Sequence, residues 1–281
     1  MTPMKSNIPD FGIHDGVPSS VYHSWNALSS TWLKRWVSSS AAHAHAEEID
    51  AESVPLRLGT AVHAKLLEPH AYSQLIAVAP QCDRRTTAGK ELYATFLSGL
   101  NGRTVIDEEM QETVNGIHRV VESMSSCRET LANCKDKELS IVAEVNGVVG
   151  KARLDAYDAD AGLILDVKTT SLLAGDFARQ AWNLNYALQL AWYRSVAQAA
   201  GLTVNRCAIL ICETKRPWGC RVALMPNAMI DYADAAIAAG CAEWCECRRT
   251  GEFPNYPDTV IELEVPSWMN RQMEGAVDVG N

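Results

Sequence analysis

Residues 138–170 read ELSIVAEVNGVVGKARLDAYDADAGLILDVKTT, and this stretch decides the fold of the chain. Two runs of β-forming residues meet at Asn146-Gly147, a dipeptide that suits the positive φ angles of a type I′ hairpin turn. A second turn, from Asp158 to Gly162, leads into a short apolar strand over residues 163–165. The stretch therefore predicts a β-hairpin followed by a further strand.

Three side chains suited to metal and phosphate chemistry follow from this pattern. Strand alternation places Asp166 and Lys168 on one face, while Val167 points the other way. Asp155, near the end of the preceding strand, can reach the same face across the turn. Mg²⁺ binds to a few carboxylates and keeps water and substrate phosphate as its other ligands. However, a strand-end Asp is often only a solvated turn residue, and D-x-K alone is a weak motif.

A histidine lies in a helical pattern upstream. Residues 58–69 predict a short helix that is capped near Thr60 and stopped by Pro69. His63 falls in its interior among apolar neighbours. A lone histidine in that setting is more often a core residue than a metal ligand.

A polar pair lies in a second helical pattern downstream. The pattern predicts one long helix over about residues 174–200. Gln189 and Tyr193 are four residues apart and therefore share one face of that helix. Taken alone, such a pair would be an ordinary buried polar contact.

Together these motifs resemble a known family. In chain order they are G-T-x-x-H, a glutamate, an aspartate, D-x-K-T and Q-x-x-x-Y, an order similar to that of the RecB-like branch of the PD-(D/E)xK nuclease superfamily. The segments LGTAVHAKLLEP (58–69), RRTTAGKE (84–91) and LDVKTT (165–170) look similar to those of RecE-type enzymes, the prophage exonuclease VIII group. Tyr22-His23, followed by a helix start at Leu28-Ser29, is also similar. The resemblance covers about residues 20–260.

The resemblance implies a fold and a function. The expected fold is α/β, with a central mixed sheet flanked by helices and a helical N-terminal portion. The implied activity is a Mg²⁺-dependent 5′→3′ exodeoxyribonuclease that degrades linear double-stranded DNA and leaves 3′ single-stranded tails for annealing-type recombination. The implied assembly is a homo-oligomeric ring of three or four subunits, with four favoured, working with a single-strand annealing protein of the RecT type. Such an enzyme would be encoded by a phage or prophage and act in the bacterial cytoplasm.

The resemblance also assigns the site residues. The implied metal ligands are the side chains of His63, Asp155 and Asp166 and the carbonyl of Val167. Lys168 matches the catalytic lysine. Glu138 matches the upstream catalytic glutamate, with Glu144 as the other candidate. Gln189 and Tyr193 match the last motif, which supports the site and contacts DNA. Leu154 stands where the superfamily name has a proline, which is often absent.

The residue types bear on the choice of cation. Carboxylates suit Mg²⁺, whereas an imidazole ligand such as that of His63 is better suited to Mn²⁺. We therefore expect Mg²⁺ as the cofactor and Mn²⁺ as an effective substitute.

The net charge of −9 argues at first against a nucleic-acid partner. The basic residues, however, are clustered at Lys34-Arg35, at Arg84, Arg85 and Lys90, at Lys215-Arg216 and at Arg248-Arg249. We interpret the first and last pairs as ordinary solvated charges. Arg84, Arg85 and Lys90, which belong to a segment similar to RecE, are expected to bind DNA.

Length and composition indicate one domain. The 281 residues are 47% hydrophobic, which is ample for a core. We expect a flexible N-terminus over 1–20, a single nuclease domain over 21–260 and a tail over 261–281. Within the domain, 21–135 should be mainly helical and 138–250 should hold the sheet and further helices. No apolar run approaches the length of a membrane span and no signal-peptide pattern appears, so we expect a cytoplasmic protein without a membrane partner.

The nine cysteines include one group that requires comment. Some RecB-type relatives hold an iron–sulfur cluster with one cysteine upstream of the nuclease motifs and three downstream. Here Cys82 could be the upstream residue, but the spacing of Cys241, Cys245 and Cys247 does not fit. No iron–sulfur cluster is expected.

Two alternatives remain open at this point. The nearer one is an endonuclease or a single-strand nuclease of the same fold. The more distant one is a non-catalytic DNA-binding recombination scaffold. The presence of Asp155, Asp166 and Lys168 argues against a scaffold, which would not need all three.

Overall fold

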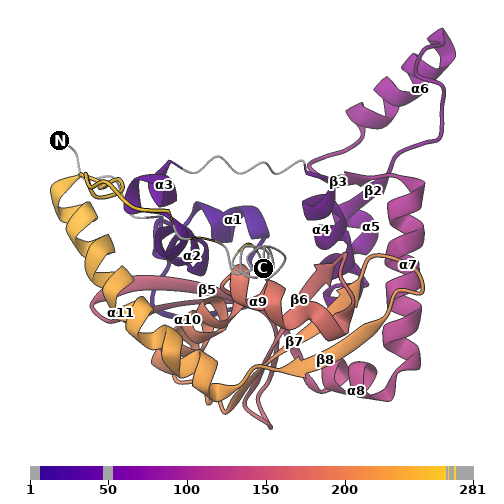
Figure 1. Ribbon diagram of the computed structural model, residues 1–281. Coiled ribbons are helices and arrows are strands. Elements are labelled where there is room, and N and C mark those ends of the chain that lie inside the picture. Colours follow the sequence, from indigo (N-terminus) through magenta and orange to yellow (C-terminus); the bar gives the residue numbers. More distant parts are fainter. Residues whose placement is uncertain (1–6, 47–52, 264, 266–268, 270–281) are drawn as a thin grey trace, which may run out of the picture.

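A mixed six-stranded sheet forms the centre of the protein, in a computed structural model that describes residues 7–46, 53–263, 265 and 269. The strand order is β1–β4–β5–β6–β7–β8 (Figure 1). The strands are β1 Gly12–His14, β4 Asp136–Val145, β5 Val148–Asp158, β6 Leu163–Thr170, β7 Arg206–Glu213 and β8 Cys220–Leu224. Only β6 and β7 run parallel, and every other pair of neighbours is antiparallel. The predicted mixed sheet is confirmed.

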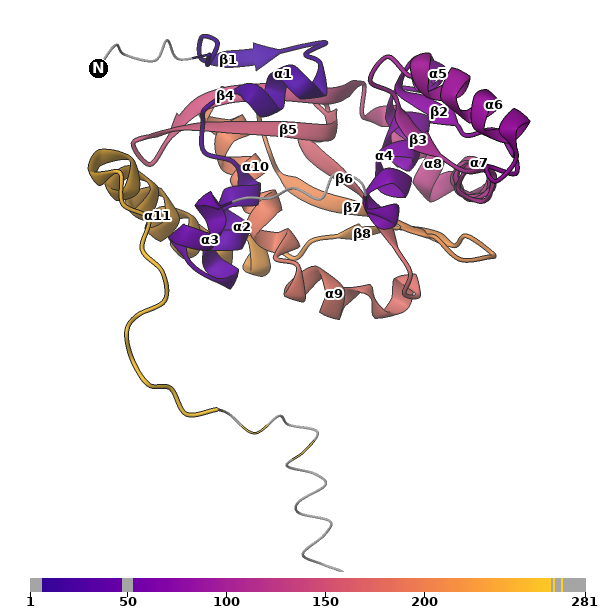
Figure 2. The same ribbon diagram turned by 90° about the horizontal axis from the view of Figure 1, so that it is seen from above.

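Helices cover both faces of this sheet (Figures 1 and 2). One core contains side chains of α2 (Ser30–Ser38), α10 (Tyr186–Ala199) and α11 (Asn227–Thr250). The core on the opposite face contains side chains of α4 (Val54–Leu67), α7 (Glu108–Ser123) and α8 (Ser125–Asn133). The shorter elements are α1 Ser19–Ser24, α3 Ala41–His45, α5 Tyr72–Leu75, β2 Ile76–Val78, α6 Thr87–Ser98, β3 Thr104–Ile106, η1 Ala174–Asp176 and α9 Phe177–Asn183.

The hairpin between β4 and β5 turns where the sequence predicts it. Asn146 and Gly147 have φ angles of 49° and 77°. Both values are positive, as the predicted type I′ turn requires. The part of the chain predicted to hold the sheet and further helices also contains β7, β8 and α11.

The N-terminal segment differs from its prediction. β1 pairs with β4, and the ammonium of Lys151 donates hydrogen bonds to the carbonyls of Tyr22 and Trp25 at 3.1 and 2.7 Å. Residues 12–14 thus form an edge strand within the segment that was expected to be flexible, and Lys151 anchors residues 22–25, which follow it. Residues 1–6 and most of the predicted tail lie outside the described residues.

Two predicted helices have different limits. α4 begins at Val54, with Pro55 in its first turn, so the expected cap at Thr60 is wrong; the Thr60 hydroxyl donates to the Leu56 carbonyl inside the helix. The predicted helix over 174–200 is divided into η1, α9 and α10. The break between α9 and α10 occurs because Asn185 adopts a left-handed conformation with φ 52°, which asparagine tolerates better than most residues.

The part predicted to be mainly helical also contains a small parallel sheet of β2 and β3. Cys241 and Cys247 are buried in α11, whereas Cys245 is exposed. Among the described residues, no helix combines the length and apolar character that a membrane crossing requires.

Candidate active site

The site lies where the ladder between β5 and β6 ends. Their pairing runs from Asp158–Leu163 to Ala156–Leu165. At the next position, Oδ2 of Asp155 accepts the backbone N–H of Val167 at 2.7 Å. A carboxylate thus replaces a backbone acceptor, and the two strands separate at an opening lined by polar atoms.

Asp166 and Lys168 occupy one face of β6, as strand alternation predicts. The Nζ of Lys168 lies 2.5 Å from Oδ2 of Asp166. Val167 points to the opposite side and is fully buried in the core beneath α4. Burial lowers the pKa of Lys168, but the charges of Asp166 and Asp155 outweigh that effect and raise it. Lys168 is therefore positively charged at neutral pH.

His63 approaches the same opening from α4. Its Nε2 lies 2.8 Å from the Val167 carbonyl oxygen, and its Nδ1 lies 3.6 Å from Oδ2 of Asp155. Burial and the charge of Lys168 lower the pKa of His63, so the imidazole is neutral at pH 7. A neutral imidazole is the form that binds metal ions. These contacts favour a role for His63 as a metal ligand over a role in core packing.

Glu138 lies on β4, next to the part of β5 that carries Asp155. It adopts φ 52°, a strained conformation for a residue with a side chain, and such strain is most often found at functional sites. It forms a cluster with His63 and Asp155, in which each residue offers one ligand atom and the three atoms lie within 4.8 Å of one another. Glu144, in contrast, is exposed near the hairpin turn. Glu138 is therefore the better candidate for the upstream acid.

The electrostatics of this cluster suit a bound cation. Burial, followed by the charge of Asp166, raises the pKa of Asp155 to about 7. Burial, followed by the charge of Asp155, also raises the pKa of Glu138. Buried carboxylates that repel one another are stabilised by a metal ion. The available donors are carboxylate oxygens, a carbonyl oxygen and an imidazole nitrogen, which fit Mg²⁺ or Mn²⁺.

The polar pair on α10 supports Asp166. Gln189 donates from Nε2 to Oδ1 of Asp166 at 2.9 Å and to the hydroxyl of Tyr193 at 3.0 Å. Its Oε1 accepts a hydrogen bond from Lys34 at 2.9 Å. Gln189 therefore orients a site carboxylate, which is the supporting role that the sequence motif implied.

Three residues of the site did not emerge from the sequence. Lys34, interpreted as a solvated charge, is half-buried at Gln189. Tyr186 lies beside Lys168, with 5.3 Å between Nζ and the ring centroid. Nε of Arg153 lies 2.5 Å from Oε2 of Glu138. Strand alternation from Asp155 could have indicated Arg153, but no local pattern signals the other two.

The basic segment before α6 lies apart from this cluster. Arg85 pairs with Asp83 at 3.0 Å, and Arg84 lies over the ring of Tyr93 at 4.8 Å. Lys90 is exposed on α6, which extends away from the body of the molecule in Figure 1. The contacts of both arginines thus stay within the segment, and DNA binding by Arg84, Arg85 and Lys90 remains a prediction.

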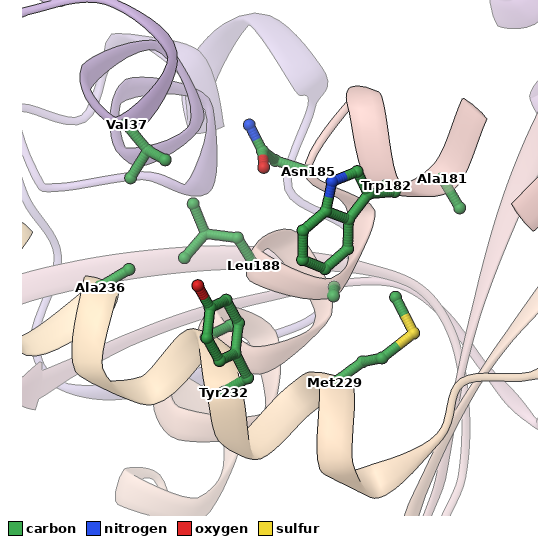
Figure 3. Close-up of a pocket in the computed structure, with 10 residues that line it drawn as sticks. Val37, Ala181, Trp182, Asn185, Leu188, Met229, Tyr232 and Ala236 are labelled. Carbon is green, nitrogen blue, oxygen red and sulfur yellow. The ribbon is translucent and has the colours of Figure 1, made fainter. Parts of the chain in front are cut away.

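An apolar pocket of about 190 Å³ lies between α2, the α9–α10 bend and α11 (Figure 3). Trp182 and Tyr232 are exposed at this pocket and their ring centroids are 6.1 Å apart. The lining comprises Val37, Ala181, Trp182, Asn185, Ala187, Leu188, Met229, Tyr232, Ala233 and Ala236. It includes no carboxylate or histidine, so the pocket is not the metal site.

One family model and one solved structure agree with this fold. The family model described as a PDDEXK-like domain of unknown function (DUF3799) matches residues 29–261. The crystal structure of a "Putative exonuclease" from Eubacterium rectale is similar with a TM-score of 0.62 at 13% identity, over 91% of this chain and 97% of that one. The crystal structure of SSO0001 aligns over 63% of this chain and 83% of that one, at 15% identity and a TM-score of only 0.26. No curated protein matches the chain.

Proposed function

Since the chain belongs to the PDDEXK-like domain family, we propose that it is a divalent-metal-dependent exodeoxyribonuclease acting on linear double-stranded DNA. We propose further that it degrades DNA 5′→3′ and leaves 3′ single-stranded tails for annealing-type recombination. The observation that carries the proposal is the convergence of Glu138, Asp155, Asp166 and Lys168 at the β5–β6 opening. The name of the Eubacterium rectale structure supports the exonuclease form of the proposal.

The proposed ligands of the cation are Asp155, Asp166, the Val167 carbonyl and His63. The proximity of Glu138 to His63 and Asp155 supports its inclusion as a further ligand in this proposal. When bound, a divalent cation neutralises phosphate charge and lowers the pKa of a coordinated water. The five groups come from α4, β4, β5 and β6, so the fold brings together ligands that are far apart in the chain.

In this proposal Lys168 is the catalytic residue that stabilises negative charge on the phosphate. Its ammonium is held against Asp166 and beside the ring of Tyr186. From there it can donate to a phosphate oxygen, or orient the attacking water, as negative charge builds up in the transition state. Gln189 keeps Asp166 in place by a hydrogen bond to the oxygen that Lys168 does not contact.

The assembly is part of the same proposal. A protomer with net charge −9 has little long-range attraction for DNA, so a ring of three or four subunits would keep the enzyme on its substrate. The resemblance to RecE favours four subunits and a RecT-type annealing partner. Native mass spectrometry gives the subunit number, and a monomer would contradict the ring.

Cleavage of two DNA forms tests the activity. With Mg²⁺, the proposed exonuclease degrades end-labelled linear duplex and spares closed circular duplex. An endonuclease cuts both forms, a single-strand nuclease spares both but cuts an unpaired strand, and a scaffold cuts none of them. Label placed at the 5′ or the 3′ end then gives the polarity, and early release of the 5′ label is the expected result.

A further inference from the structure

Lys34 lies inside the candidate active site although it is distant in sequence from the nuclease motifs. It is carried by α2, and its Nζ donates to Oε1 of Gln189 at 2.9 Å. The opposite end of the same amide donates to Asp166 at 2.9 Å. Two hydrogen bonds therefore connect Lys34 to a proposed metal ligand.

Lys34 and Lys168 differ in the charged groups that they contact. Both ammonium groups lie near the ring of Tyr186, at 5.6 and 5.3 Å from its centroid. Lys168 forms an ion pair with Asp166, whereas Lys34 forms no salt bridge with any residue that the structure describes. Burial and the charge of Lys168 lower the pKa of Lys34 to about 8. Lys34 is thus a second cation close to Lys168, and it contacts the neutral amide of Gln189 and the ring of Tyr186.

The geometry of an ammonium group indicates what Lys34 can bind. Such a group has three donors and no acceptor, and Gln189 takes one of the three. The remaining two donors are open to an anionic or polar acceptor, and a half-buried charge beside a second cation is stabilised by a nearby anion. In a nuclease, the anion that enters this region is the phosphodiester backbone.

We propose that Lys34 is a second phosphate-binding residue of the active centre, which donates to a non-bridging oxygen of the DNA strand beside Lys168. This inference rests on the proposed nuclease function. It assigns a substrate contact to α2 and so gives the helical N-terminal portion a part in substrate binding. The alternative is that Lys34 only holds Gln189 in its orientation.

The salt dependence of DNA binding distinguishes these roles without requiring cleavage. Binding of a fluorescent duplex to the full-length protein is measured by anisotropy in EDTA at several salt concentrations. Lys34→Met should weaken binding on the order of tenfold. It should also reduce the slope of log affinity against log salt by about 0.9, the value for one lost phosphate contact. Lys34→Arg should retain most of the slope.

Lys135→Met is the matched control. This variant loses the same charge from an exposed side chain that pairs with Asp160 in the turn between β5 and β6. It should leave the affinity and the salt slope unchanged. Thermal unfolding of each variant checks that the fold is retained.

The possible outcomes separate the two proposals. If Lys34→Met shows the wild-type salt slope, Lys34 does not bind phosphate, whatever the activity of the protein. If wild-type protein fails to cleave DNA with Mg²⁺ but the slope still falls in Lys34→Met, the proposed catalysis is wrong and the phosphate contact stands. If Lys34→Met does not fold, Lys34→Gln and Lys34→Arg are compared in the same assay, and equal slopes in these two would overturn the inference.

Discussion

Asp155 and Val167 are joined by a hydrogen bond that ends the pairing between β5 and β6. The carboxylate accepts the Val167 N–H at 2.7 Å, and the carbonyl of the same residue lies 2.8 Å from Nε2 of His63. Because the carboxylate takes the place of a strand partner, the Val167 carbonyl faces the opening, where His63 contacts it. The same hydrogen bond therefore separates the two strands and positions Asp155 in the candidate site.

The pH dependence of metal binding should follow Asp155. Its pKa is raised to about 7, so at lower pH a cation must displace a proton to bind. Affinity for Mn²⁺ should therefore rise about tenfold per pH unit below pH 7 and level off above pH 8. Calorimetric titration between pH 5.5 and 8.5 measures this, and an affinity that does not change over that range would contradict it.

The same shift predicts how the stability of the metal-free protein depends on pH. In the unfolded chain Asp155 titrates near its ordinary pKa of about 4, whereas in the fold its pKa is about 7. Its stabilising contribution is complete below about pH 4 and is lost as the pH rises through 7. Metal-free wild type should thus lose thermal stability between pH 5.5 and 8 by more than Asp155→Asn does. Parallel losses in both proteins would exclude Asp155 as the cause.

Lys168→Ala should separate metal binding from catalysis. Lys168 contacts Asp166 but is not one of the proposed ligands, so the variant should keep its affinity for Mn²⁺. Its turnover should fall by about 10²–10³-fold, as expected for a donor that acts in the transition state. A variant that also lost its metal would show that the lysine has a structural role instead.

His63→Ala tests whether α4 contributes to the site. The imidazole contacts Val167 and Asp155 and is not part of the core, so its loss should lower metal affinity on the order of tenfold with little change in thermal stability. Val62→Ala, at the fully buried neighbouring position, should do the opposite. If His63→Ala lowered the melting temperature as much as Val62→Ala, the core-residue interpretation would be correct.

Glu138 and Glu144 offer a matched pair on one strand. Glu138→Gln removes a charge from the cluster with His63 and Asp155, so it should reduce both metal affinity and cleavage. Glu144→Gln removes the same charge from an exposed position and should change neither. Cleavage rates and Mn²⁺ titrations of the two variants decide between them, and equal effects would remove Glu138 from the site.

The sequence predicted those parts of the site that depend on local periodicity. Alternation along one strand is sufficient to place Asp166 and Lys168 together, and Asn146-Gly147 is sufficient to predict a turn. The contact between Lys34 and Gln189 joins residues 155 positions apart, and no local pattern specifies it. The break at Asn185 was missed because the helical periodicity continues on both sides of a single left-handed residue.

The most direct measurement of the central claim is Mg²⁺-dependent hydrolysis of linear duplex DNA by wild type, Asp166→Asn and Asp160→Asn. Asp166 is buried between Lys168 and Gln189, whereas Asp160 is exposed in the turn before β6. Wild type and Asp160→Asn should degrade the DNA at equal rates and stop when EDTA is added, and Asp166→Asn should be inactive. Unchanged turnover in Asp166→Asn, or cleavage that continues in EDTA, would contradict the metal-dependent nuclease site.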